Sequence, residues 1–450
     1  MERSQDVQKK NPEIPESLNP VQDKGRPGYK HTPLGWIPKE WEVVRFDAVF
    51  EFLSTNSFSR ENLTEISTEN NIQNIHYGDI HAKFKNELLD CENEILPKIK
   101  DGVTIIQYSN FIKDGDLIIT DASEDYEGVG KCIEVMNVGD KKILSGLHTF
   151  LARDNSGLTA QGFRTYIFRN PKVNKELKRI ATGISVYSIS KRNLETLKLT
   201  IPTFVEQRRI AAILSTWDEA ITKTQQLIAQ LQQRNKGLMQ QLLTGKKRLK
   251  GFEKTKFSLS PINSFAKEIS DKNRQDKDLI VLSCTKYHGL VPSLEYFGRK
   301  IYSDNLTTYK IVSKNCFAYA TNHIEEGSIG YQSQYDEALI SPMYTVFKTN
   351  HSVDDEFLYK ILKSHHYIHE YQKRMEGSID RRGGLRWNEF SKIKVPVPSL
   401  GEQKQIAAIL SHADNELQLY EQKLGILQQQ KKGLMQKLLT GEVRVKIDNN

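Results

Sequence analysis

The chain has 450 residues, a hydrophobic content of 38% and a formal net charge of +8. This length gives room for roughly three domains of ~150 residues, and the hydrophobic content, with 18 Tyr and 18 Phe, excludes a disordered chain. The basic excess favours a polyanionic partner without requiring one.

The first globular region is expected after a polar lead-in. Residues 1–34 are rich in Pro, Asn, Lys and Gly and predict a flexible segment. Residues 35–201 read as mixed strands and short helices, with a strand at Leu117–Thr120 behind the turn-rich stretch 109–116. His148 is expected to be a buried polar residue.

The remainder repeats this order. A helical region is predicted over 202–250, a second globular domain over 251–397 with a strand at Cys316–Ala320, and a second helical region over 398–450. The four cysteines lack zinc-ligand spacing, and no apolar run reaches about 20 residues. We therefore expect no metal site, no disulfide framework, no membrane span and a cytoplasmic location.

The two helical regions are copies of each other. Residues 202–245 and 398–441 align without a gap at an offset of 196, and 23 of the 44 positions are identical. A period this long is too great for a solenoid, whose units have about 20–50 residues. The globular parts also match, but are far more diverged. The sequence thus predicts two similar halves. Their helical regions share one role, and their globular parts have different roles.

Apolar residues in the helical regions follow a heptad. The seam of the first copy holds Leu214, Ile221, Ile228, Asn235 and Leu242, and the second has Lys431 where the first has Asn235. This narrow seam predicts two paired helices, antiparallel if the halves are related by a pseudo-two-fold axis. A polar seam residue typically fixes the register.

Both ends of these helices carry sequence signals. Gly245 and Gly441 suit left-handed C-terminal caps. Ser215 and Ser411, each three residues before an Asp, resemble N-terminal caps or lie inside one longer helix. With the start near Trp217, the first helix would be about 40 Å long.

One motif occurs twice in the chain: Pro-x-x-x-Glu-Gln-x-x-Ile-Ala-x-Ile-Leu, followed by a predicted helix that ends in Leu-Leu-Thr-Gly. In this repeated motif the chain resembles the specificity (S) subunit of type I restriction–modification systems. The resemblance covers the chain from about Gly35 onward. It implies two target recognition domains of mixed α/β (α+β) fold, separated by two long antiparallel coiled-coil helices. Each domain would read half of a bipartite, asymmetric site in double-stranded DNA.

The same resemblance implies the partners. The helix pair would set the spacer between half-sites and dock two modification (methyltransferase) subunits, and restriction (translocase/nuclease) subunits would join them. S-adenosylmethionine, ATP and Mg would belong to those partners, with no cofactor in this chain. A coiled-coil adaptor that assembles proteins without reading DNA is the alternative.

We expect no catalytic residues. The Asn-Pro pairs lack the second proline of a methyltransferase motif, and Gly245-Lys246-Lys247 lacks the other residues of a phosphate-binding loop. The chain is therefore predicted to be a non-catalytic, DNA-binding subunit.

Loops that mix basic, amide and aromatic residues are the candidates for DNA contact, because cations bind phosphate and planar polar groups read base edges. Solvated surface loops are the competing interpretation, and Tyr77 and Tyr287 fit a core equally well. In the first domain the candidates are Tyr77, Asp79, His81, Lys83, Ser123, Tyr126, Tyr187, Ser188, Lys191 and Arg192. In the second domain they are Lys286, Tyr287, His288, Asn322, His323, Arg381, Arg382, Arg386 and Trp387.

Four positions shared by the two copies of the repeat carry a separate hypothesis. Glu206-Gln207 and Glu402-Gln403 stand at the start of the two helical regions and are either structural or part of the partner-docking surface.

Overall fold

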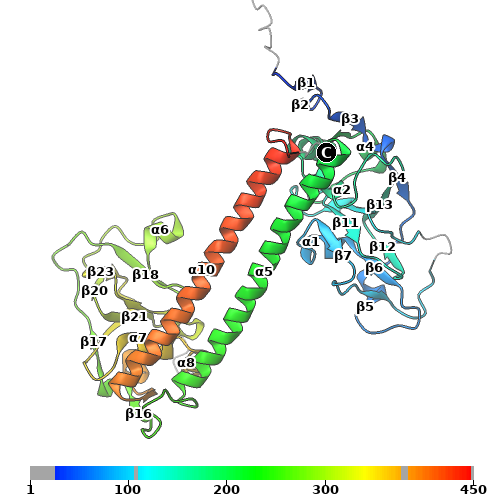
Figure 1. Ribbon diagram of the computed structural model, residues 1–450. Helices are drawn as coiled ribbons and strands as arrows, with labels where there is room; N and C mark the ends of the chain where they lie inside the picture. The colour runs from blue at the N-terminus through cyan, green and yellow to red at the C-terminus, as the bar shows by residue number, and fades with distance from the viewer. Residues whose placement is uncertain (1–25, 106–109, 377–383, 447–450) are drawn as a thin grey trace, which may run out of the picture. The chain divides into compact units, whose positions relative to one another are not determined.

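The computed structural model describes residues 26–105, 110–376 and 384–446 of the chain (Figure 1). The fold is mixed α+β, as predicted, and the chain divides into two compact units. Unit 1 comprises 1–222 and 425–450, and unit 2 comprises 223–424. Each unit therefore takes part of both long helices, whereas the predicted boundaries assign each helical region whole. Among the described residues, none of the helices is long and apolar enough to cross a membrane.

Unit 1 contains two main sheets, ordered β4-β13-β9-β11-β7 and β12-β6-β8-β5, with the small pairs β1-β2, β3-β15 and β10-β14. Its strands are β1 (Tyr29–Thr32), β2 (Gly35–Pro38), β3 (Glu42–Arg45), β4 (Phe50–Leu53), β5 (Leu63–Thr64), β6 (Gln73–Ile75), β7 (Leu88–Asp90), β8 (Lys98–Ile99), β9 (Leu117–Thr120), β10 (Ala122–Ser123), β11 (Cys132–Met136), β12 (Ile143–Ser145), β13 (Thr149–Asp154), β14 (Tyr187–Ser188) and β15 (Lys198–Ile201). Its short α-helices are α1 (Tyr77–Ala82), α2 (Arg164–Ile167), α3 (Pro171–Arg179) and α4 (Lys191–Glu195).

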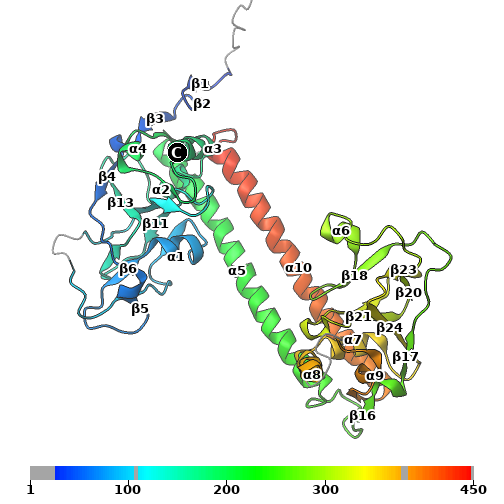
Figure 2. The same ribbon diagram turned by 180° about the vertical axis from the view of Figure 1, so that it is seen from behind.

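Unit 2 repeats this plan with the sheets β17-β24-β21-β22 and β19-β18-β23-β20 and the pair β16-β25. Its strands are β16 (Ser258–Pro261), β17 (Ala266–Ile269), β18 (Val281–Thr285), β19 (Gly289–Pro292), β20 (Lys310–Ser313), β21 (Cys316–Ala320), β22 (Ile329–Gln332), β23 (Glu337–Ile340), β24 (Tyr344–Thr349) and β25 (Lys394–Val397). Its short α-helices are α6 (Ser293–Phe297), α7 (Asp355–Leu362), α8 (His365–Glu376) and α9 (Trp387–Phe390), the last three gathered at the end of the unit where α10 (Leu400–Leu439) begins (Figure 2).

The predicted strands at Leu117–Thr120 and Cys316–Ala320 are confirmed as β9 and β21. Both strands are buried along their whole length. On one side β9 pairs with β13, and β21 pairs in the same way with β24. The internal duplication thus extends to the strand order of the globular domains, although their sequences have diverged.

Part of the predicted flexible lead-in forms a strand. The hairpin of β1 and β2 starts at Tyr29, whose hydroxyl donates a hydrogen bond of 2.6 Å to the carbonyl of Gly441. The expected boundary at residue 34 is therefore wrong. Gly441, which accepts this hydrogen bond, lies 412 positions away in the sequence, so no local sequence pattern predicts the contact.

The two long helices are α5 (Phe204–Leu243) and α10, with 40 residues each. Each spans about 60 Å at ~1.5 Å per residue, so the predicted start near Trp217 is too late. Ser215 and Ser411 lie inside the helices. The true start follows Thr203, whose hydroxyl accepts the backbone N–H of Glu206 at 3.4 Å, and Ser399 takes the equivalent place. Gly245 and Gly441 have φ of 69° and 71°, which confirms the left-handed caps.

Within each unit the two helix segments run antiparallel. In unit 1, Leu214 of α5 and Leu438 of α10 share one core, and Asp218 contacts Lys431. In unit 2, Asn235 donates a hydrogen bond of 2.8 Å to the carbonyl of Ala413. All five seam residues of the first copy are buried, which confirms the predicted heptad pairing.

Candidate nucleic-acid interface

Three separate segments of unit 1 that carry predicted DNA-contacting residues come together. Strand β10 pairs with β14, so that Ser123 lies opposite Tyr187 and Ala122 opposite Ser188. The ring of His81 approaches the carbonyl of Ala122, with 3.2 Å between Nε2 and oxygen. The segments 77–83, 122–126 and 187–192 thus form one surface, which we call the first loop cluster.

Aromatic rings and one imidazole organise this cluster. The ring of Tyr77 stands edge-on to His148 at 5.3 Å, and Nδ1 of His148 lies 3.1 Å from a carboxylate oxygen of Asp121. Tyr126 packs edge-on against Tyr187 at 5.2 Å. His148 is exposed, so its predicted burial is wrong. His148 lies just before β13, and its ring contacts Tyr77 of the cluster.

Two of the predicted residues point inward. Asp79 is 3% exposed. Its carboxylate accepts hydrogen bonds from the two terminal nitrogens of Arg60, with nitrogen–oxygen distances of 2.6 and 3.1 Å. This hydrogen-bonded pairing raises the pKa of Arg60 and holds the start of α1. Ser123 is also buried, and its hydroxyl accepts the backbone N–H of Asp125 at 3.2 Å. Both side chains therefore support the loops and do not present polar groups to a ligand in this structure.

The cations of the cluster lie at its edge. Lys83, Lys191 and Arg192 are exposed, and the ammonium of Lys191 lies over the rings of Phe52 and Phe150 at 5.5 and 5.7 Å. Lys83 also donates to the carbonyl of Ile95. Tyr77, His81, Tyr126 and Tyr187 are at least partly accessible, as is Ser188.

A buried lysine secures the base of α1. The ammonium of Lys131 donates to the carbonyls of Ile80 and Phe84, the latter at 3.3 Å, and burial lowers its pKa. Because a helix end leaves carbonyls without partners, this contact stabilises the turn that follows α1.

Unit 2 gathers its predicted residues in the same way. Asn322, Arg386 and Trp387 line one open cleft of about 480 Å³ together with Thr321 and Met343. The backbone N–H of Leu385 donates to the carbonyl of Thr321 at 2.7 Å, just as that of Ile189 donates to Asp121 at 2.8 Å in unit 1. The loops after β21 and before α9 thus form the second loop cluster at the place that corresponds to the first.

The turn between β18 and β19 joins this second cluster. The ammonium of Lys363 bridges the carbonyls of Lys286 and Gly327 at 2.6 and 2.7 Å, and burial lowers its pKa. This places Lys286, Tyr287 and His288 beside the loop that holds His323. Tyr287 is 76% exposed, which excludes a core role, and the ammonium of Lys286 lies 5.4 Å from its ring.

Other predicted residues of unit 2 differ in their surroundings. Asn322, His323 and Arg386 are exposed, whereas Trp387 packs against Phe347 at 5.3 Å and belongs mainly to the core. Arg381 and Arg382 lie outside the described residues. His323, Glu325 and Glu326 could offer three ligand atoms within 4.8 Å of one another, and His323 and Glu326 are exposed whereas Glu325 is half-buried.

The surface also carries apolar and aromatic residues that the sequence did not indicate. In unit 1 these are Ile184 and Val186, between the paired residues Thr182 and Ser188. In unit 2 they include Tyr296 and Phe297 of α6, beside His288, and Met343. Exposed isoleucines and valines in a loop give no signal in a single sequence, because the same residues usually mark a core.

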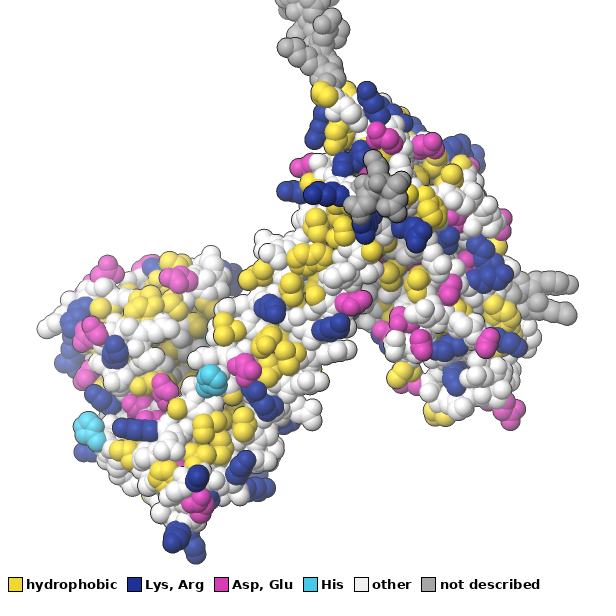
Figure 3. Space-filling model, in the orientation of Figure 1, with side chains coloured by type: hydrophobic (Ala, Val, Ile, Leu, Met, Phe, Trp, Pro, Cys, Tyr) yellow, Lys and Arg dark blue, Asp and Glu magenta, His cyan; other side chains and the backbone are white. Residues whose placement is uncertain are grey.

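Charge is not segregated over the visible face of either unit, where basic and acidic side chains alternate (Figure 3). On this face, neither unit presents one broad basic patch.

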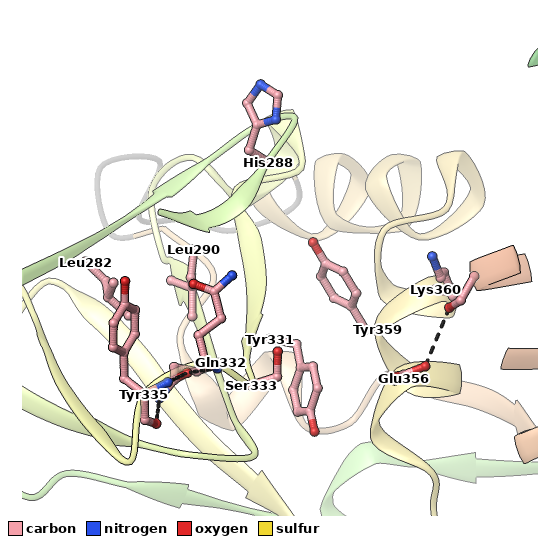
Figure 4. A pocket seen from close by; sticks show the side chains of 12 residues that line it. Leu282, His288, Leu290, Tyr331, Gln332, Ser333, Tyr335, Glu356, Tyr359 and Lys360 are labelled. Carbon is pink, nitrogen blue, oxygen red and sulfur yellow. Dashed lines mark hydrogen bonds between the residues drawn. The ribbon is translucent and has the colours of Figure 1, made fainter. Parts of the chain in front are cut away.

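A pocket of about 260 Å³ in unit 2 lies between β22 and α7 (Figure 4). Its polar groups are largely engaged with neighbours: Tyr331 donates to Asn315 at 2.9 Å, and Glu356 accepts from Ser411 at 3.5 Å. Lys360 is paired with Asp414. This arrangement stabilises the contact of α7 with α10 and suggests no chemistry.

The Glu-Gln pairs at the helix starts are deeply buried. Glu206 accepts hydrogen bonds from Trp41 at 2.8 Å and Thr203 at 2.9 Å, and the amide of Gln207 binds the backbone of Ala160 at 2.7 Å. Gln403 makes the same type of contact with Asp354 at 2.7 Å, and Glu402 is paired with Arg248. These four side chains join each helix to its domain, so a docking surface would use their exposed neighbours.

Comparisons with known proteins agree on one family. A sequence profile described as the type I restriction modification DNA specificity domain matches residues 38–233 and 260–429. The chain is 24% identical over 447 residues to the candidate type I restriction enzyme MjaX specificity subunit of Methanocaldococcus jannaschii, covering 93% of this chain and 97% of that protein. It is also 24% identical over 440 residues to the MjaVIII specificity subunit of the same organism, covering 91% and 94%.

Solved structures show the same fold. The S subunit of a type I restriction–modification system from M. genitalium is 15% identical and superposes with a TM-score of 0.53, covering 90% of this chain and 96% of that one. A chain from a study of the complex assembly and conformational transition of the type I R-M system gives a TM-score of 0.51 at 16% identity, covering 90% and 99%.

Proposed function

Because this chain belongs to the family of type I restriction modification DNA specificity domains, we propose that each of its loop clusters reads one half of a bipartite DNA site. The chain is a specificity subunit with two DNA-recognition domains.

One observation carries it. The two units place loops at corresponding positions, fixed by the equivalent hydrogen bonds Ile189–Asp121 and Leu385–Thr321, and fill them with different side chains. The first cluster presents Tyr77, His81 and Tyr187, and the second presents Lys286, Tyr287 and Asn322. Because base edges are distinguished by the pattern of donors, acceptors and methyl groups they present, different loops predict two different half-sites and an asymmetric target.

The helix starts point to a repeated partner. Both units use a buried glutamate paired with an arginine, Glu206–Arg444 and Glu402–Arg248, at the same position of the repeat. Two helical regions that share 23 of 44 positions suit two copies of one protein, and we assign these to two methyltransferase (modification) subunits. Restriction subunits complete the assembly, and S-adenosylmethionine, ATP and Mg²⁺ act in the partner subunits.

In this proposal the chain itself is not an enzyme. Its contribution is to hold two readers on the duplex, while the partners carry out methylation and cleavage. An adaptor that assembles proteins without reading DNA is the competing function, and it predicts no sequence-specific binding to duplex DNA.

The test is a genome-wide map of N6-methyladenine in cells that carry the modification-subunit gene, with and without this chain. We expect a split, asymmetric motif with a fixed gap only when the chain is present. An unchanged methylation pattern would contradict DNA reading, and co-purification of the chain with the modification subunit would then identify an adaptor.

A further inference from the structure

A small hairpin in unit 1 presents two apolar side chains to solvent beside the first loop cluster. Ile184 is 93% exposed and Val186 is 53% exposed. They lie in the turn between Thr182 and Ser188, and we call residues 182–188 the apolar hairpin. Single exposed apolar residues are common on protein surfaces, and what distinguishes these two is the way their turn is built.

The apolar hairpin has a fixed geometry. Thr182 and Ser188 exchange two backbone hydrogen bonds, of 2.9 and 2.8 Å. Gly183 has a φ of 132°, and a Cβ atom there would lie 1.9 Å from the carbonyl oxygen of Val186. Only glycine fits this closure. The backbone of the turn is thus closed before any partner binds, which lowers the entropic cost of binding a partner through it.

The hairpin continues directly into the first loop cluster. Tyr187 and Ser188 form β14, which pairs with β10, and the ring of Tyr187 packs against Tyr126. The exposed cations Lys191 and Arg192 follow after two residues. A two-stranded ribbon has the width to enter the major groove of B-DNA, and flanking cations suit the phosphates on its rim.

The same segment of the repeat is charged in the second half. The hydrogen bonds of Ile189 and Leu385 correspond, so the sequence at the tip, Ile184-Ser185-Val186, aligns with Asp380-Arg381-Arg382. Residues 380–382 lie outside the described part of the chain, so this comparison is one of sequence alone. Apolar residues in one copy and charged residues in the other are expected where two domains read different bases. A surface that docks the same partner twice would instead keep the same residues.

We propose that the apolar hairpin is a base-reading element in which Ile184, with Val186 beside it, contacts the C5-methyl group of a thymine in the major groove. This inference rests on the proposed function and adds the chemical group that the first domain recognises. The thymine methyl is the one apolar group that a base pair presents in the major groove, which makes an aliphatic side chain its natural contact.

The experiment uses the complex of this chain with its modification subunits and a duplex containing the mapped target. Deoxyuridine, which lacks the methyl group, replaces each thymine of the half-site read by the first domain, one at a time. Removing one buried methyl group should weaken binding of the unaltered complex by roughly fourfold at one position. Ile184→Ser should bind the thymine duplex about as weakly and show no further weakening with deoxyuridine.

Ile66→Ser is the matched control, since Ile66 is 77% exposed on another loop of unit 1. It should keep both the affinity and the sensitivity to deoxyuridine. If Ile184→Ser behaves like this control, or if the half-site contains no A·T pair, the inference is wrong.

Two further outcomes are distinguishable. In the first, Ile184→Ser causes part of the complex to lose its modification subunits, while the fraction that stays assembled binds the target normally. The hairpin is then a protein contact and the inference fails. If the unaltered complex does not distinguish its target from a scrambled duplex, the proposed function itself fails.

Discussion

Glu206 and Arg444, 238 residues apart in the sequence, form an ion pair with 2.6 Å between Oε1 and Nε. Glu206 is 1% exposed and also accepts from Trp41 and Thr203. The carboxylate therefore joins the start of α5, the segment after α10 and the first residues of the globular domain. Glu402 and Arg248 make the equivalent pair in unit 2, also at 2.6 Å.

Arg444→Met should destabilise unit 1, because it leaves the Glu206 carboxylate buried without its cation. Removing one partner of a buried pair costs several kcal/mol, and partial exposure of Arg444 reduces this to about 2 kcal/mol. Urea denaturation followed by tryptophan fluorescence would measure the destabilisation. Arg179→Met, which removes an exposed pair with Glu176, should cost less than about 0.5 kcal/mol, and an equal effect of the two changes would contradict this assignment.

Lys431→Met should also be destabilising, for a related reason. Lys431 lies 2.6 Å from Asp218 and 2.9 Å from Glu87, and these carboxylates raise its pKa against the lowering effect of burial. Without the ammonium, two largely buried acids face each other, at a cost of about 3 kcal/mol.

The triple change Lys431→Met, Asp218→Asn, Glu87→Gln serves as the control for this prediction. It removes these three charges together, leaves Arg169 without the Glu87 carboxylate that lies 3.3 Å away, and should recover most of the free energy of unfolding. A triple variant as unstable as Lys431→Met would show that packing, and not charge, is what Lys431 supplies.

Glu134 predicts a pH dependence. It is fully buried, and burial raises the pKa of its carboxyl to about 7, although the backbone N–H groups of Gly162 and Thr165 oppose the shift. Between about pH 4.5 and 7 the folded chain therefore binds more protons at this site than the unfolded chain, so stability falls as pH rises through this window.

Glu134→Gln removes this titration. The stability of the variant relative to the native chain should rise across the window by on the order of 3 kcal/mol. The measurement is the free energy of unfolding of both proteins at intervals from pH 4.5 to 8. A constant difference over this range would show that Glu134 has the same pKa in both states.

The parts of the fold that the sequence predicts are those with a local cause. The heptad from Leu214 to Leu242 predicts a paired helix because its spacing alone decides which face is buried. Gly245 and Gly441 mark the helix ends because few other residues adopt a positive φ without cost. The strand at Leu117–Thr120 follows from an apolar run behind a turn. The predicted helix start is wrong, although Thr203-x-x-Glu206 carries the pattern of a capping box.

The candidate interface is predictable only as a set of segments. Tyr77, Ser123 and Tyr187 are candidates individually, and their convergence depends on the pairing of β10 with β14. The inward orientation of Asp79 depends on Arg60, 19 positions away and without any pattern linking the two. Lys431 is identifiable as a polar seam residue, but its partner Glu87 lies in the loop before β7, 344 positions earlier.

The cations at the edge of the first loop cluster give a direct test of phosphate binding. Arg192 is exposed and follows β14, so Arg192→Ala should weaken binding of the assembled complex to any duplex. Removing one cation that binds a phosphate reduces the slope of log K against log salt by about 0.9, and titrations at several salt concentrations would measure this change. Lys30→Ala is the control, because Lys30 is exposed on β1, beside the residue that contacts Gly441. If Arg192→Ala leaves affinity and slope unchanged while Lys30→Ala reduces them, the phosphate-binding surface lies at the end of the helices and not at the loop cluster.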